Sequence, residues 1–272
     1  MDILSIREDF ISGKVDLVSF YNDVIKRIED KKELNIFLDF SKEKVMERVE
    51  FLNNKLKNKE KLGSLFGISV SVKDNILVKG YKNTCGSKIL ENYSPIFNAT
   101  IIDRLLEEDA VILGKVNMDE FAMGGSGETS YFGATKNPLD ESLIPGGSSS
   151  GSASSVSADL AMISLGSDTG GSVRNPASFC ACVGYKPTYG MISRYGVVSM
   201  ASSLDQVGIL SNDVKSILPV INTIGGVDKM DAVTMRDTVD FKEDNNFSIK
   251  GLKIATVSNI EEYEIDDVVL SD

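Results

Sequence analysis

Two turns rich in glycine and serine could place hydroxyl groups and backbone amides around one ligand. The first turn begins at Gly146 and contains Ser148, and the second begins at Asp168 and contains Ser172. Small residues let the backbone approach a ligand, and serine hydroxyls can attack a substrate or relay protons. An apolar run at 160–165 separates the turns and has the length of a buried strand. We therefore predict two loops that one core strand connects, rather than a flexible glycine-serine linker.

The second turn, DTGGSVRNP, has the groups that acyl transfer needs. It offers consecutive N–H groups for an oxyanion, those of Thr169, Gly170 and Gly171. Ser172 follows them as the natural nucleophile. Asp168 and Arg174 could pair across the turn and hold its shape, which would also be a purely structural role.

The chain contains no histidine, so another side chain must act as the base. Lys73, Asp74 and Asn75 follow an alternating run at 66–72 that predicts a half-buried strand. Burial there would lower the pKa of the Lys73 amine from its usual value of about 10.4 and make it a proton acceptor. A hydroxyl from the serines at 148–150 could pass the proton between Lys73 and the nucleophile. A surface ion pair between Lys73 and Asp74 is the alternative.

Composition excludes several classes of function. The net charge of −11 argues against unaided binding of nucleic acid. There is no signal-peptide pattern and no apolar run near the ~20 residues of a membrane span, so we expect a cytoplasmic protein. The three cysteines, Cys85, Cys180 and Cys182, are expected to be small buried residues rather than disulfides. Without histidine a zinc site is not expected, and phosphate-binding glycine motifs are incomplete.

The elements that must position these residues predict an α/β protein with a mixed β-sheet covered by helices. Residues 1–60 are predicted to be an N-terminal helical segment, with Ser41 as the cap of its third helix. Beyond it, strand and helix patterns alternate. Strands are expected at 66–72, 110–114, 161–166, 182–187 and 251–257, and a helix at 98–109.

The stretch 146–177 resembles the signature of the amidase signature family over its whole length. Ser148 precedes Ser172 by 24 residues, and the stretch closes with the Ser-x-Arg-x-Pro pattern of that family. Lys73 lies 75 residues before Ser148, where the family places its catalytic lysine. The resemblance implies that Ser172 is the acyl-forming nucleophile, Ser148 a bridging serine with a cis peptide, and Lys73 the general base.

Two further segments, 116–138 and 189–210, resemble the glutaminase subunits of bacterial tRNA-dependent amidotransferases, a branch of that family. This resemblance implies that the side-chain amide of glutamine acylates Ser172, ammonia leaves, and water clears the ester. The ammonia would pass to a partner, the B subunit, which would bind ATP and Mg²⁺ and hold Glu-tRNA(Gln) for conversion to Gln-tRNA(Gln). A third, C subunit would complete the heterotrimer, and no cofactor is expected in this chain.

Members of the family continue beyond the last residue of this sequence. The resemblance therefore implies an amidase signature domain at 61–272 whose C-terminal part is missing, including side chains that grip the glutamine. Two alternatives remain open. The chain could be a stand-alone amidase that acts on another amide, or a scaffold subunit that keeps the fold without catalysis.

Overall fold

The computed structural model describes residues 2–234, 239–242, 248–253, 255 and 265. Met1–Phe241 form one compact unit and Lys242–Asp272 form a second. The described residues of the second unit contain no helix or strand. Of the strand predicted at 251–257, residues 251–253 and 255 are described and are not in a strand, and the other three lie outside the described residues.

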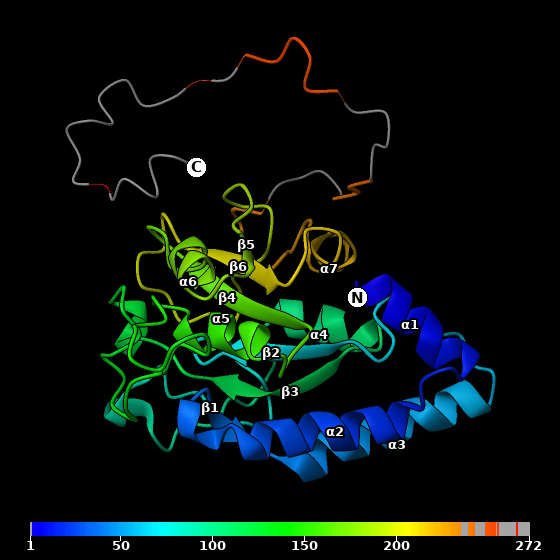
Figure 1. Cartoon of the computed structure of the whole chain (residues 1–272). Coiled ribbons are helices and arrows are strands. Elements are labelled where there is room, and N and C mark those ends of the chain that lie inside the picture. The colour runs from blue at the N-terminus through cyan, green and yellow to red at the C-terminus, as the bar shows by residue number, and fades with distance from the viewer. Residues whose placement is uncertain (1, 235–238, 243–247, 254, 256–264, 266–272) are drawn as a thin grey trace. The chain divides into compact units, whose positions relative to one another are not determined.

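A mixed sheet of six strands forms the centre of the first unit (Figure 1). The strands are β1 (Phe37–Phe40), β2 (Ser69–Lys73), β3 (Val111–Val116), β4 (Ile163–Asp168), β5 (Val183–Tyr185) and β6 (Gln206–Ser211), in the order β1-β3-β2-β4-β6-β5. β2 runs parallel to β3 and β4, and the other pairs are antiparallel. The carboxyl ends of parallel strands lie at one edge of a sheet, so Lys73 and Asp168 meet there. The predicted mixed α/β sheet is confirmed.

Helices cover both faces of this sheet. They are α1 (Ile3–Ser12), α2 (Leu17–Asp30), α3 (Lys42–Lys57), α4 (Thr100–Glu107), α5 (Ser150–Ser157), α6 (Arg174–Phe179) and α7 (Ile217–Ile224). Val70 and Val72 of β2 share a hydrophobic cluster with α4 and α7. Ser71, which alternation turns to the other face, lies 2.7 Å from Ser155 of α5 through their hydroxyl oxygens. A second cluster joins α2 and α3 to β3.

The N-terminal helices begin and end at residues suited to those positions. The carboxylate of Asp2 accepts the N–H groups of Leu4 and Ser5, and Gly13 ends α1 in the left-handed conformation. The hydroxyl of Ser41 accepts the N–H of Lys44 at the start of α3, as predicted. These caps satisfy amide groups that have no partner inside the helix.

The prediction that residues 1–60 are helical is wrong at one place. Phe37–Phe40 form β1, an edge strand that pairs antiparallel with β3. Aromatic residues favour strands, but the run FLDF is short and lies between two strong helical patterns, so the sequence did not indicate a strand there. β3 approaches β1 so closely at Gly114 that a Cβ atom there would overlap the carbonyl oxygen of Asp39.

The serine-rich stretch after Ser149 also differs from the predicted loop. It forms α5, and its residues from Ser150 to Val156 are buried. Small side chains allow the helix to approach the sheet, since a Cβ on Gly151 would come 2.5 Å from the amide nitrogen of Asn117. The hydroxyl of Ser152 donates to the carbonyl of Leu165 at 3.0 Å, so burial leaves it satisfied.

We expect Gly114→Ala to lower the free energy of unfolding by about 1 to 3 kcal/mol, because β1 must shift away from β3 to admit the methyl group. The control is Gly125→Ala, where a Cβ meets no atom within 4 Å. Urea denaturation followed by circular dichroism measures both. Equal losses of stability in the two variants would contradict the close approach at Gly114.

Candidate active site

Lys73 ends β2 and is fully buried. Its Nζ lies 2.7 Å from the Oγ of Ser148, 3.0 Å from the Oγ of Ser167 and 3.2 Å from the carbonyl oxygen of Ser167. The structure thus brings together the predicted base and the predicted bridging serine, although 75 residues separate them in the chain.

The environment of Lys73 favours a neutral amine. Burial lowers its pKa to about 7, while the more distant carboxylates of Asp119, Asp168 and Asp205 act in the opposite direction. Among the described residues no carboxylate lies within ion-pair distance of its Nζ. A substantial fraction of the amine can therefore accept a proton near neutral pH.

Asp74 does not pair with Lys73, so the surface ion pair considered from the sequence is wrong. Its carboxylate lies 3.2 Å from the Nζ of Lys115, and both side chains are buried. The same carboxylate accepts the N–H of Thr84 at 2.8 Å. Lys115 also reaches the side-chain oxygen of Asn83 at 2.8 Å. The first unit therefore buries two lysines near each other, one with a carboxylate partner and one without.

The first turn places Ser148 between Lys73 and the second turn. The peptide bond between Gly147 and Ser148 is cis. The N–H of Gly147 donates to the Oδ1 of Asn175 at 2.9 Å, and the carbonyl of Ser148 accepts the N–H of Asp119 at 3.2 Å. A Cβ atom on Gly147 would overlap the carboxylate of Asp119, so no larger residue fits there.

The carboxylate of Asp168 organises the second turn. It accepts the N–H groups of Gly171 at 2.8 Å and Val173 at 3.0 Å, and two bonds from the Arg174 guanidinium at 3.1 Å each. Burial alone would raise the pKa of Asp168, but the bonds from Arg174, Val173 and Gly171 outweigh it and lower the pKa. The pair of Asp168 and Arg174 expected from the sequence is present.

One of the three expected oxyanion donors is occupied in this arrangement, because the N–H of Gly171 points to Asp168. Within the described part of the chain, the N–H groups of Thr169, Gly170 and Ser172 have no hydrogen-bond partner. A Cβ atom at Gly170 would meet nothing within 4 Å, so open space lies in front of the turn. These three amides are available to a developing oxyanion.

Ser172 is 9% exposed and lies where the two turns touch. The N–H of Ser149 donates to its carbonyl oxygen at 3.1 Å, which ties it to the residue after Ser148. No hydrogen bond joins the hydroxyls of Ser148 and Ser172 among the residues that the structure describes. Of the two proton-transfer contacts that the sequence implied, the structure contains the one between Lys73 and Ser148.

Sequence reasoning gave no role to several residues that hold the site together. Ser167 contacts Lys73, and Asn75 contacts Ser167 at 3.0 Å. Asp205 accepts a bond from the hydroxyl of Thr169 and anchors the loop that contains Ser199. Ser167 lies within a strand pattern and Asp205 in an ordinary polar loop, so neither carried a signal. The position of Asn75 beside Lys73 was the only hint.

The three cysteines form no disulfide. Cys85 and Cys180 are buried, Cys182 is partly buried, and all three are free. Burial raises the pKa of their thiols to about 12, 11 and 12, respectively. The described residues contain no cluster of side chains able to hold a metal ion. None of their helices has the length and apolar character to cross a bilayer.

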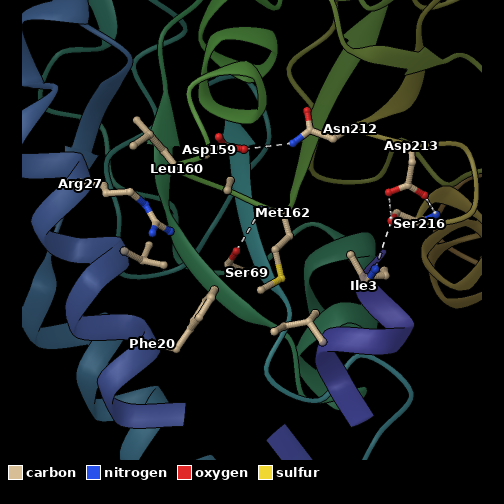
Figure 2. A pocket seen from close by; sticks show the side chains of 13 residues that line it. Ile3, Phe20, Arg27, Ser69, Asp159, Leu160, Met162, Asn212, Asp213 and Ser216 are labelled. Atoms are coloured by element: carbon tan, nitrogen blue, oxygen red, sulfur yellow. Dashed lines mark hydrogen bonds between the residues drawn. The ribbon is translucent and has the colours of Figure 1, made fainter. Parts of the chain in front are cut away.

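Figure 2 shows a cavity that Lys73, Ser148 and Ser172 do not line, and its volume is about 270 Å³. Arg27 and Phe20 of α2, Ser69 at the start of β2 and Met162 before β4 line it. It therefore lies near the amino ends of the two strands whose carboxyl ends carry Lys73 and Asp168. A smaller cavity of about 200 Å³ adjoins the second turn, since Asp205 lines it.

Comparisons with known proteins agree on one family. The family model described as Amidase matches residues 20–271. The A subunit of glutamyl-tRNA(Gln) amidotransferase from Fusobacterium nucleatum is 50% identical over 253 residues, which are 92% of this chain and 52% of that protein. The corresponding protein from Chlorobium phaeobacteroides is 48% identical over 252 residues, 92% of this chain and 53% of that protein. The chain thus spans about half the length of the curated relatives it matches.

Solved structures give the same result. The A subunit of glutamyl-tRNA(Gln) amidotransferase from Thermotoga maritima superposes with a TM-score of 0.82 at 42% identity, covering 94% of this chain and 53% of that one. The native peptide amidase of Stenotrophomonas maltophilia superposes with a TM-score of 0.82 at 30% identity, covering 86% of this chain and 50% of that one.

The two buried lysines should respond differently to replacement by methionine. Lys115→Met leaves the Asp74 carboxylate buried without a cation, so we expect a loss of about 3 to 5 kcal/mol in the free energy of unfolding. Lys73→Met removes an amine that folding must deprotonate, so at pH 7 we expect no comparable loss. Urea unfolding of both variants measures the difference, and equal losses would contradict the distinct environments of the two amines.

The lowered pKa of Lys73 also predicts how the free energy of unfolding changes with pH. Between the folded pKa of about 7 and the ordinary value of about 10.4, the unfolded chain binds a proton that the folded chain does not. The wild type should therefore gain stability relative to Lys73→Met as pH rises through this window. Urea unfolding at pH 7, 8 and 9 measures the difference. Parallel pH curves for the two proteins would show that Lys73 is buried as an ammonium.

Proposed function

This chain belongs to the amidase family, and on that premise we propose that it is the glutaminase subunit of a tRNA-dependent amidotransferase. The observation that carries the proposal is the buried Lys73, which has no carboxylate partner among the described residues and lies 2.7 Å from Ser148. The names of the relatives, which are A subunits of glutamyl-tRNA(Gln) amidotransferases, support glutamine as the amide.

In the proposed reaction the Oγ of Ser172 attacks the side-chain carbonyl carbon of glutamine. Its proton passes to the hydroxyl of Ser148, which gives its own proton to Lys73. The oxyanion that forms is stabilised by the free amides of the second turn, those of Thr169, Gly170 and Ser172. Gly171 supports this geometry through its bond to Asp168 rather than by donating to the oxyanion.

Collapse of this intermediate breaks the carbon–nitrogen bond. Lys73 returns the proton through Ser148 to the leaving nitrogen, so ammonia departs and the γ-glutamyl ester of Ser172 remains. Water then attacks the ester, with Ser148 and Lys73 again accepting and returning one proton. Glutamate leaves and the serine hydroxyl is restored.

The ammonia would be used by partners rather than by this chain. We propose that a B subunit binds ATP and Mg²⁺, holds Glu-tRNA(Gln) and converts it to Gln-tRNA(Gln), and that a C subunit completes a cytoplasmic heterotrimer. The net charge of −11 fits this division of labour, because an acidic chain is poorly suited to hold tRNA itself.

A stand-alone amidase is the second candidate. It is favoured by the superposition on the peptide amidase, which is as close by TM-score as that on the Thermotoga maritima protein. Ammonia release from glutamine, and from C-terminally amidated peptides, distinguishes the two when it is assayed with and without the B and C subunits. An amidase that prefers peptides and ignores the partners would replace our proposal.

Three substitutions test the assigned roles. We expect Ser172→Ala to lower the rate of ammonia release from glutamine by about 10³-fold or more, because no acyl ester can form. Ser148→Ala and Lys73→Ala interrupt proton transfer and should each cost about 10²- to 10⁴-fold. The matched control is Ser178→Ala, an exposed serine of α6. Retention of full activity in any of the first three variants would refute that residue's role, and an inactive wild type with both partners would refute the glutaminase.

A further inference from the structure

Within the described part of the chain, three oxygen atoms lie within hydrogen-bond distance of the amine of Lys73, and Ser167 supplies two of them. Its hydroxyl oxygen lies 3.0 Å from Nζ and its carbonyl oxygen lies 3.2 Å away, while Ser148 supplies the third oxygen at 2.7 Å. A carbonyl oxygen can only accept a hydrogen bond, so one N–H of Lys73 always points to Ser167.

Asn75 fixes the position of the Ser167 hydroxyl. Its Nδ2 donates to the Oγ of Ser167 at 3.0 Å and to the carbonyl of Val198 at 3.2 Å. Because the Val198 carbonyl can only accept, the amide cannot be turned round, and the Ser167 oxygen always receives an N–H from Asn75. One lone pair of that oxygen is thereby filled, and the other remains for Lys73.

The side chain of Asn75 occupies this position at an energetic penalty. Asn75 is 2% exposed, and its Oδ1 has no hydrogen-bond partner among the described residues. A buried acceptor without a partner costs about 1 to 3 kcal/mol. A leucine would fill the same volume without that penalty, so packing alone does not account for an amide here.

Protonation of Lys73 creates an ammonium with three N–H groups, and three oxygen atoms surround it. The charged or titratable groups that act on it come from different elements: Cys85 after β2, Asp119 after β3, Asp168 at the end of β4 and Asp205 before β6. None of these forms an ion pair with it, and the Asp168 carboxylate is paired with Arg174. Neutral oxygen atoms are therefore the nearest acceptors for the ammonium.

We propose that Asn75 and Ser167 are a positioning pair that receives the N–H groups of protonated Lys73 during turnover and so sets the pH range in which Lys73 takes a proton from Ser148. The inference rests on the proposed role of Lys73 as base. It adds two buried residues that tune the proton affinity of the base through neutral hydrogen bonds.

Two substitutions should move the pH at which Lys73 loses its proton, and they should move it in opposite directions. Ser167→Ala removes an acceptor from the ammonium, so Lys73 should lose its proton at lower pH. Asn75→Asp places a carboxylate beside the Ser167 hydroxyl, so the ammonium should persist to higher pH. We expect shifts of about one pH unit each way. Simple damage to the fold would instead lower the rate at every pH.

The rate at which a fluorophosphonate probe labels Ser172, measured by intact-protein mass spectrometry from pH 5 to 10, reports these shifts. The wild-type rate should be half-maximal near pH 7. Ser164→Ala, another buried serine of β4, is the control and should keep the wild-type profile. Ser167→Thr keeps the hydroxyl and should restore the wild-type midpoint, which covers the case in which Ser167→Ala fails to fold.

Shifts in the same direction, or unmoved midpoints in both variants, would overturn the inference. A wild type that is not labelled at Ser172 would overturn it together with the proposed mechanism. Because the probe is not glutamine, a labelled wild type that releases no ammonia contradicts only the proposed glutaminase, and the opposite shifts would still support the positioning pair.

Discussion

The burial of one amine without a counter-ion is the constraint on which the site depends. An ammonium loses its hydration when it is buried, and a carboxylate partner normally offsets that loss. Lys115 has such a partner in Asp74, whereas the hydrogen-bond partners of Lys73 within the described ranges are all neutral oxygen atoms. Burial lowers the pKa of both amines, but the carboxylate of Asp74 acts against this effect in direct contact with Lys115, whereas the carboxylates that act on Lys73 lie further away. The position of a single carboxylate therefore distinguishes the environments of the two lysines.

Small residues make this arrangement possible. At Gly147 and at Gly151 of α5 a larger side chain would overlap a neighbour, and at Gly170 it would fill the open space in front of the second turn. Serine is used in the same way along α5, because its hydroxyl satisfies a strand carbonyl while its volume stays small. An aspartate holds each turn: the backbone N–H of Asp119 donates to the carbonyl of Ser148 in the first, and the carboxylate of Asp168 accepts N–H groups of the second.

The residues of the site could be predicted from the sequence more fully than the elements of the fold. Alternation predicted β2, an apolar run predicted β4, and the absence of histidine led us to expect Lys73 as the base. β1 was missed because its four residues are too few to outweigh the helices around them, and α5 because serine carries no hydrophobic period. Backbone details such as the bond from Gly171 to Asp168 depend on which way an amide points, which residue types do not encode.

The distances along the chain that the site spans have a consequence for folding. Lys73 reaches Ser148 across 75 residues and Ser167 across 94, from one parallel strand to the end of another. Non-local pairings of this kind form slowly, because the entropy of closing long loops must be overcome first. Lys73 therefore loses its hydration only when β2, β4 and α5 have come together. In partly folded chains Lys73 should therefore be an ordinary, protonated lysine until the sheet is assembled.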